Sequence, residues 1–579
     1  MRDADRTGAL ALMTDFVQFA LFFAVVTALV GPLGTYQARV FAGERTWLDA
    51  ILKPIERAIH RLCGIDPTVD MSWSAYARAF VSMGGAGTLL LYLILRAQQW
   101  LPLAANGSHI TTSMTPDLAA NTAVSFATTG TWQAYAGETT MTYFSQLAGL
   151  VAQNFIAGAA GLAVGIAFIR GMARERSAGL GNFWADVVRA TLWVLLPLSV
   201  AGALALAWQG VPMTVAPYHT VTTLEGTKQV IAHGPVAALE FIKQLGTNGG
   251  GFFNANGAHP FENPTPLTNF IELLAIAVLP ASLTAAFGRM TGRRRDGWVL
   301  YGVMAVLFAV GVAAAHHAEW QGSPSVAGAA GATQAPNMEG KEVRFGVGGS
   351  VLAAVVTSDG ATGSTNAALD SFMPAGGAVP LVNMLLGEIV FGGLGTGLVS
   401  IILVALLGVF ITGLMIGRTP AYMGKKLGPT EVKLIMLYSL AAPAVILVLT
   451  ALAVVTSSGL AGLTTNAGTH GFTEILYAYA SAFANNGQSF AGLSANSPFY
   501  NVTTGIAMIA GRFLLVIPAL ALAGQMARAR RQDEVGALST GTVLFGGVVL
   551  ATALIVGALT FLPALALGPV AEQLTMWGP

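Results

Sequence analysis

The chain has 579 residues, of which 54% are hydrophobic and only 10% are Asp, Glu, Lys or Arg. Because soluble domains average roughly 25% charged residues, this composition excludes a water-soluble globule and indicates a polytopic membrane protein. The formal net charge of +1 provides no basic field for nucleic acid. The single cysteine excludes an intramolecular disulfide and a cysteine-based metal cluster.

Ten apolar segments are long enough to cross a hydrocarbon core of roughly 30 Å, which takes about 20 helical residues. The sequence therefore predicts an all-α fold with spans near residues 8–32, 76–98, 144–169, 185–208, 266–288, 297–316, 380–416, 432–456, 500–526 and 540–567. The first segment carries Asp15 and Gln18 and is too long for the apolar part of a signal peptide. We therefore expect it to be a retained helix.

Basic residues predict the orientation, because Lys and Arg accumulate on the cytoplasmic side. Five alternate connections, 33–74, 170–189, 289–295, 417–433 and 528–531, hold 20 of the 29 basic residues. Connections 104–142 and 457–499 hold none, and 209–265 and 317–379 hold two each. We therefore expect a multi-pass membrane protein whose two termini both lie on the outer side.

Each outer connection contains a second apolar stretch that is too short to span the membrane and too apolar for a solvated loop. These stretches begin at Thr115, Gly234, near Ser350 and at Thr473, and we expect short re-entrant helices there. At the first, Thr115 is predicted as the N-cap, Pro116 as the first helical residue and Asp117 as part of the first turn.

A polar, glycine-containing turn follows each short helix. The predicted filter residues in these turns are Thr128, Thr129 and Gly130; Thr247, Asn248 and Gly249; Thr362, Gly363 and Ser364; and Asn485, Asn486 and Gly487. In the third unit the turn centres on either Gly360 or Gly363. Gln133, just after the first turn, is expected to anchor that turn rather than to bind an ion.

The unit of helix, short helix, polar turn and helix thus occurs four times, which indicates an internal repeat. The second and fourth units share Asn-Gly, ten residues and then Pro-Phe-x-Asn. The expected division is an N-terminal helix and loop at 1–74, pore repeats at 75–183, 184–295, 296–428 and 429–535, and a C-terminal helix at 536–579. Four repeats around one axis predict a pseudo-fourfold pore.

The turns favour binding of a desolvated monovalent cation. Irregular backbone at membrane depth persists only where protein buries it or where it lines a wet cavity. Short helices that end there direct the negative end of the helix dipole inward, and glycine allows carbonyl groups to replace the hydration shell of K⁺. Each turn taken alone is also compatible with a simple helix connection, but four equivalent turns favour the pore.

Six long segments resemble the potassium-binding A subunit of the bacterial Kdp potassium-transporting P-type ATPases, within the superfamily of potassium transporters. They are NTAVSFATTGTWQAYAGETT (121–140), TNGGGFFNANGAHPFENPT (247–265), GEIVFGGLGTGL (387–398), LMIGRTPAYMGKK (414–426), NNGQSFAGLSANSPF (485–499) and FLPALALGPVAE (561–572). The resemblance implies that K⁺ is the transported ion. It also implies that the ion is captured in the filter and passes through an intramembrane tunnel to a separate ATPase subunit.

The partners implied by the resemblance are the catalytic B subunit, an accessory C subunit and a small single-span F subunit. The chain itself is expected to contact the lipid bilayer of the bacterial inner membrane, with both termini on the periplasmic side. The chain contains neither a DKTG phosphorylation motif nor a G-x-x-x-x-G-K-[ST] loop, so we expect no ATP site in it. The alternative function is a stand-alone potassium channel or ion-coupled symporter of the same superfamily. A third class, an intramembrane enzyme, lacks a matching set of catalytic residues in the sequence.

Two further features lie beneath the predicted filter. Arg512 is a basic residue deep in a predicted span, where it either repels leaking cations, holds a gate or pairs with a carboxylate such as Glu388. The second feature is a glycine run, just after Glu388, that is expected to break the seventh span near its middle: Gly392, Gly393, Gly395 and Gly397. The resemblance implies that this broken helix gates the path beneath the filter, as it does in the related transporters; the alternative is a hinge with no gating role.

Overall fold

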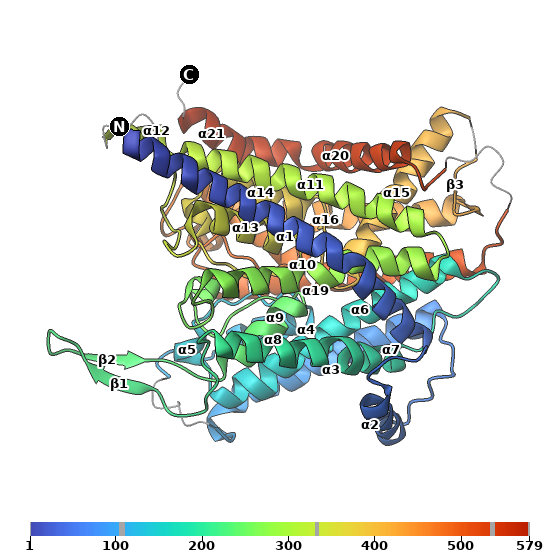
Figure 1. The fold of residues 1–579 in the computed structure, drawn as a ribbon, viewed down its shortest axis with the longest axis horizontal. Coiled ribbons are helices and arrows are strands. Elements are labelled where there is room, and N and C mark those ends of the chain that lie inside the picture. The colour runs from blue at the N-terminus through green and yellow to red at the C-terminus, as the bar shows by residue number, and fades with distance from the viewer. Residues whose placement is uncertain (1, 104–109, 330–334, 418, 533–538, 577–579) are drawn as a thin grey trace.

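The computed structural model describes residues 2–103, 110–329, 335–417, 419–532 and 539–576, and within them the fold is almost entirely helical (Figure 1). Ten helical segments are long and apolar enough to cross a membrane, as the sequence predicts. They contain α1 (Arg2–Ala42), α3 (Trp73–Ala97), η3 and α6 (Ser145–Val151, Ala152–Ala173), α7, η4 and α8 (Phe183–Arg189, Ala190–Leu195, Leu196–Trp208), α10 (Pro266–Met290), α11 (Arg294–Gln321), α15 (Thr396–Met415), α16 (Pro429–Val455), α19 (Pro498–Arg528) and α20 (Val543–Leu565).

Burial separates inner from outer spans. The most apolar window of the η3–α6 span is 83% buried and that of α10 is 78% buried, whereas the windows of α3, α16 and α20 are each 22% buried. The outer group includes α1, which packs along α10, and α20, which packs on α15. The two terminal spans therefore cover the bundle from outside. Their exposed apolar side chains lie where a lipid bilayer would contact the protein.

Four short helices lie where the sequence predicts re-entrant segments. They are α4 (Pro116–Ala127), α9 (Val236–Leu245), α13 (Gly346–Asp359) and α18 (Gly468–Ala484). Thr115 is the N-cap residue of α4 and Pro116 its first residue, although the Thr115 side chain makes no capping hydrogen bond. Two of the helices start earlier than expected, α13 one turn before Ser350 and α18 before Thr473.

The seventh predicted span is interrupted. Helix α14 (Pro374–Leu385) ends before a loop at 386–395, and α15 begins at Thr396. The glycine run lies in this loop and in the first turn of α15. The expected break in this span is therefore present, and the segment 380–416 consists of the end of α14, the loop and α15.

The remaining elements are small. Helix α2 (Asp49–Cys63) is amphipathic, and two antiparallel hairpins are formed by β1 (His219–Thr222) with β2 (Lys228–Ile231) and by β3 (Ala421–Tyr422) with β4 (Lys425–Lys426). His219 pairs with Ile231, and Ala421 with Lys426. Short helices complete the described chain: η1 (Gln98–Trp100), α5 (Gly137–Thr140), η5 (Asn256–Ala258), α12 (Pro324–Ala329), η6 (Leu369–Ser371), α17 (Ser457–Leu460), η7 (Ala566–Val570) and α21 (Ala571–Met576).

Candidate functional site: a ring of four turns

The turn after each short helix shares one backbone feature. In every repeat two residues separated by one position have positive φ, which non-glycine residues seldom adopt. The pairs are Thr129 (69°) and Thr131 (39°); Thr247 (49°) and Gly249 (83°); Ala361 (50°) and Gly363 (67°); and Asn485 (57°) and Gly487 (79°). The four turns are therefore structurally equivalent.

The turns close into a ring through contacts between the third residue of one turn and the middle residue of the next. A Cβ atom added to Gly249 would collide with the carbonyl oxygen of Thr362, and one added to Gly363 with that of Asn486. A Cβ atom on Gly487 would collide with the carbonyl oxygen of Gly130. The circle closes where the hydroxyl of Thr131 donates to the carbonyl oxygen of Asn248.

This equivalence shifts two of the predicted filter triplets by one residue. The first turn comprises residues 129–131, while Thr128 is the C-cap of α4. The third comprises residues 361–363, and Ser364 lies just beyond it, where its hydroxyl bonds to Gln244. The shift in the first turn arises because it has threonine where the other three have glycine. Gly363, with positive φ, rather than Gly360 occupies the glycine position.

A cavity of about 150 Å³ lies directly against the ring. The first residues of all four turns line it, namely Thr129, Thr247, Ala361 and Asn485. Glu388, Arg512 and apolar residues of α15, α16 and α20 form much of the remaining wall. Four segments from distant parts of the sequence thus meet at one space, which has room for several water molecules.

Arg512 and Glu388 both line this cavity but contact different turns. The Arg512 guanidinium is buried and donates to the hydroxyl of Thr129 and to the carbonyl oxygen of Ala157, both at 3.0 Å. The carboxylate of Glu388 accepts from the side-chain amide of Asn486 at 2.9 Å. These partners differ from the alternative left open by the sequence, in which Arg512 pairs directly with Glu388.

The glycine run packs closely beneath the ring. The backbone amide of Leu394 donates to the hydroxyl of Thr247 at 2.9 Å, which joins the broken segment to the second turn. Gly395 has a φ of +89° and lies against Gly161 and Gly165 of α6, where a Cβ atom would collide with backbone. Gly392 and Gly397 lie against each other, and Gly393 lies beside Thr396. Side chains at these positions would collide with the loop itself or with α6, so the close packing of the loop requires glycine there.

Gln133 fixes the chain that leaves the first turn to the chain that leaves the second. Its side-chain amide donates to the carbonyl oxygen of Gly251 at 3.1 Å and accepts from the Gly251 amide at 2.9 Å. The reciprocal pair joins the two segments, and the role of Gln133 as a support of the filter stays a prediction.

Behind the second turn lies a fully buried charge cluster that sequence reasoning missed. The Lys243 ammonium is 2.6 Å from Glu240 and 2.7 Å from Glu262, and all three side chains are 0% exposed. It also donates to Asn256 at 2.9 Å. The carbonyl oxygen of Lys243 accepts from the amides of Asn248 and Gly249. The signal available in the sequence was Glu240 and Lys243, three residues apart in an otherwise apolar short helix.

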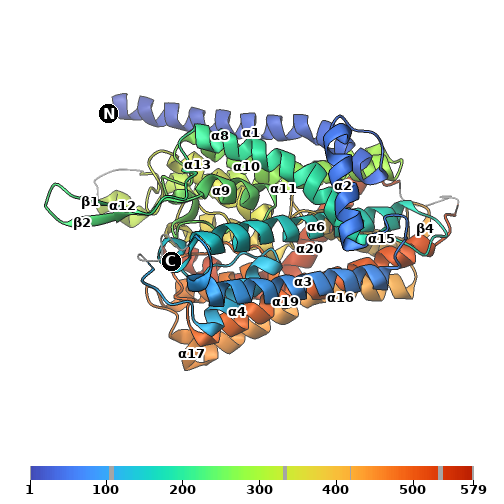
Figure 2. The same ribbon diagram turned by 90° about the horizontal axis from the view of Figure 1, so that it is seen from below.

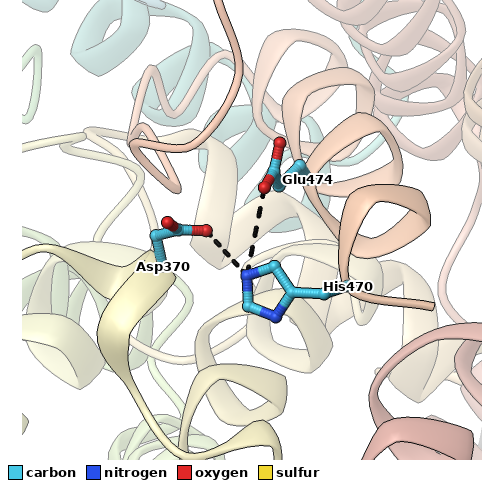
Figure 3. Close-up of side chains that lie close together, drawn as sticks. All are labelled: Asp370, His470 and Glu474. Atoms are coloured by element: carbon cyan, nitrogen blue, oxygen red, sulfur yellow. Dashed lines mark hydrogen bonds and ion pairs between the residues drawn. The ribbon is translucent and has the colours of Figure 1, made fainter. Parts of the chain in front are cut away.

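A second charge cluster joins α18 to η6 and α21. Figure 3 shows three of its side chains, Asp370, His470 and Glu474. His470 lies 2.7 Å from Asp370 through Nε2 and 2.7 Å from Glu572 of α21 through Nδ1. Glu474 lies 4.0 Å from Nε2 and accepts from Asn466. Hydrogen bonds to Asp370 and then to Glu572 raise the pKa of His470 from 6.5 to about 10. The donor atoms are close enough for a metal ion, but both ring nitrogens already bond to carboxylates, so the geometry is that of a bridging imidazolium.

Comparison with known proteins decides the family. The model of the family described as "Potassium-transporting ATPase A subunit" matches residues 20–574. The chain belongs to this family. Relatives described as potassium-transporting ATPase potassium-binding subunits include one from Granulibacter bethesdensis, 52% identical over 97% of this chain and 99% of the relative. Another, from Methylobacterium radiotolerans, is 51% identical over 97% of this chain and 98% of the relative.

Among solved structures, the potassium transporter TrkH from Vibrio parahaemolyticus is similar with a TM-score of 0.48 and 14% sequence identity. The similarity covers 85% of this chain and 97% of that one.

Proposed function

We propose that this chain is the potassium-binding, channel-like subunit of an ATP-driven, high-affinity potassium uptake pump. The observation that carries the proposal is the closed ring of four equivalent turns in a member of the A-subunit family. Positive φ at the glycine positions turns backbone carbonyl groups toward neighbouring turns, and carbonyl oxygens are the ligands that replace the hydration shell of K⁺. The C-terminal ends of four short helices add negative potential at the ring.

The proposed filter consists of residues 129–131, 247–249, 361–363 and 485–487, with Gln133 as its support. Thr128 and Ser364 flank it. The four pore repeats, 75–183, 184–295, 296–428 and 429–535, each supply one short helix and one turn. The flanking segments 1–74 and 536–579 supply the two terminal spans that cover the bundle.

In the proposed orientation the protein lies in the bacterial inner membrane, with the ring near the periplasm and the basic connections in the cytoplasm. Both termini lie outside. The partners are a P-type ATPase subunit (B), an accessory C subunit and a small F subunit, and ATP binds to the partner rather than to this chain. The names of the relatives favour this assembly over a stand-alone channel or symporter.

The proposed exit from the filter is the cavity beneath the ring. It extends from the four turns toward α15, α16 and α20, a direction that supports lateral transfer to a partner subunit. Arg512 and the loop at 386–395 form its wall next to the ring. A fixed positive charge there opposes free leakage of K⁺, which a pump must prevent.

Gly249 provides the direct test. Gly249→Asp places a side chain against the carbonyl oxygen of Thr362, and we expect K⁺-stimulated ATPase activity of the assembled complex to require a much higher K⁺ concentration. The matched control is Gly226→Asp, in the turn between β1 and β2, where φ is also positive but the space is open. Unchanged K⁺ affinity and selectivity in Gly249→Asp would remove Gly249 from the filter.

The pump assignment has its own test. The purified chain alone should not support K⁺ flux in liposomes, whereas the assembled complex should transport K⁺ only when ATP is supplied. Rapid flux through the isolated chain without ATP would favour the channel interpretation instead.

A further inference from the structure

Helix α2 is oriented differently from the spans. Figure 2 shows it running across the direction of α1, α3 and α6, beside the end of the bundle to which the basic connections belong. It packs on α7 and η4, and Glu56 bonds to the guanidinium of Arg189 at 2.9 Å. An axis that crosses the spans lies parallel to the plane of a membrane.

The surface of α2 is divided into three faces. Leu52, Glu56 and His60 form the buried face against the bundle. A second face is apolar yet exposed, with Ile51, Ile55 and Leu62 at 68%, 43% and 86% exposure. The exposed Trp47 precedes the helix near this face. Exposed apolar side chains at helical spacing, with a tryptophan beside them, are typical of a helix that rests in the membrane interface.

The third face is basic. Lys53, Arg57 and Arg61 follow one another at spacings of four residues, and Arg57 and Arg61 are exposed. Lys53 pairs with Asp49 at 2.7 Å, and no ion pair ties Arg57 or Arg61 to the described residues. At 100° per residue the basic face lies roughly opposite the exposed apolar face. Insertion of the apolar face would therefore hold these cations at the level of the lipid headgroups.

We infer that α2 is an interfacial helix whose basic face binds the headgroups of anionic phospholipids. Apolar burial positions the helix, and each Lys or Arg at an anionic membrane surface contributes roughly a fivefold gain in affinity, the equivalent of about 1 kcal/mol. The role is separate from potassium binding and does not depend on it. Lipid binding at α2 would thereby depend on how much anionic phospholipid is present in the leaflet beside the basic connections.

Cys63, the single cysteine of the chain, is exposed at the C-terminal end of α2 and allows a direct measurement of depth. The assembled transporter, carrying a nitroxide on Cys63, is placed in nanodiscs of phosphatidylcholine with phosphatidylglycerol. We expect greater access for dissolved oxygen and less for a water-soluble nickel complex than in the Cys63→Ser, Leu224→Cys control. Leu224 is fully exposed in the turn between β1 and β2.

Water-like access at Cys63 would overturn the inference. Protection of the nitroxide from both reagents would also overturn it, because a protein subunit would then cover α2. Lipid specificity is measured separately, by the competition between spin-labelled phosphatidylglycerol and spin-labelled phosphatidylcholine for the transporter. For a variant with Lys53→Gln, Arg57→Gln and Arg61→Gln, we expect the preference for phosphatidylglycerol to fall at least fivefold.

The matched control removes the same charge from other exposed positions at the same end, with Arg176→Gln, Lys433→Gln and Arg530→Gln. If the preference for phosphatidylglycerol falls equally in the α2 variant and in this control, it reflects general electrostatics. That result would overturn a specific role for α2. High salt should reduce the preference of the wild type and leave little effect in the α2 variant.

Discussion

The hydroxyl of Thr131 donates to the carbonyl oxygen of Asn248 and so occupies the position that a glycine holds in the other three turns. In those turns the glycine packs against the neighbouring carbonyl without bonding to it. One of the four ring carbonyls therefore has a permanent hydrogen-bond donor. The proposed filter is chemically asymmetric even though its backbone has near-fourfold symmetry.

Thr131→Val should weaken K⁺ binding. The substitution keeps the branched shape but leaves the buried carbonyl oxygen of Asn248 without its donor, at a cost of about 1–3 kcal/mol. We expect the K⁺ concentration for half-maximal ATPase activity of the complex to rise roughly tenfold. Thr131→Ser retains the hydroxyl and should remain near the wild type. A wild-type K⁺ response in Thr131→Val would show that this hydrogen bond does not shape the filter.

Lys243→Met should destabilise the second repeat. The variant leaves the buried carboxylates of Glu240 and Glu262 without their shared cation, and breaking a buried ion pair costs about 3–5 kcal/mol. Thermal unfolding of the purified complex should therefore shift to a clearly lower temperature. Lys228→Met removes the other basic residue of the same connection from the exposed strand β2 and serves as the control. Equal unfolding temperatures for the two variants would contradict the role of the cluster.

The His470 bridge should make stability depend on pH. Since its folded-state pKa of about 10 lies above the ordinary value of 6.5, the stabilisation is complete below about pH 6.5 and is lost as the pH rises toward 10. The facing groups are Asp370, Glu474 and Glu572. We expect His470→Gln to remove this decline in unfolding temperature, while His317→Gln, at an exposed position of α11, keeps it. An identical pH profile for wild type and His470→Gln would disprove the bridge.

Arg512→Gln should uncouple transport. Without the guanidinium, the cavity beneath the ring loses its fixed positive charge, and Thr129 loses a donor at 3.0 Å. Passive K⁺ efflux from liposomes that contain the complex should increase, and ATP-driven uptake should fall. The control is Arg528→Gln at the exposed end of the same helix, α19. Normal coupling in Arg512→Gln would leave Arg512 with a structural role at most.

The sequence predicts the short helices well because their signals are local. An apolar stretch too short to span identified each one, and Thr115 and Pro116 also marked the start of α4. Helices α13 and α18 begin at Gly346 and Gly468, both with positive φ, which resemble loop residues in a linear pattern. Because these glycines carry no helix signal of their own, the two starts could not be located from the linear pattern.

The exact composition of the ring could not be predicted for the same reason. Alignment on glycine selects Gly130 in the first turn, whereas the structural equivalent of Gly249 is Thr131. Its positive φ and its contact with Asn248, 117 residues away, identify it. Likewise, the burial of Lys243 depends on Glu262 folding back over α9 from a later segment.

The interruption between α14 and α15 makes the third repeat different from the other three. Within the described residues, the spans that follow the other three turns (η3–α6, α10 and α19) have no comparable loop in them. The loop at 386–395 in the third repeat is attached to the second turn by the hydrogen bond from the Leu394 amide to the Thr247 hydroxyl. In the proposed function this loop is the gate and the second turn is part of the filter, so a movement of the loop would be transmitted to the filter through this hydrogen bond.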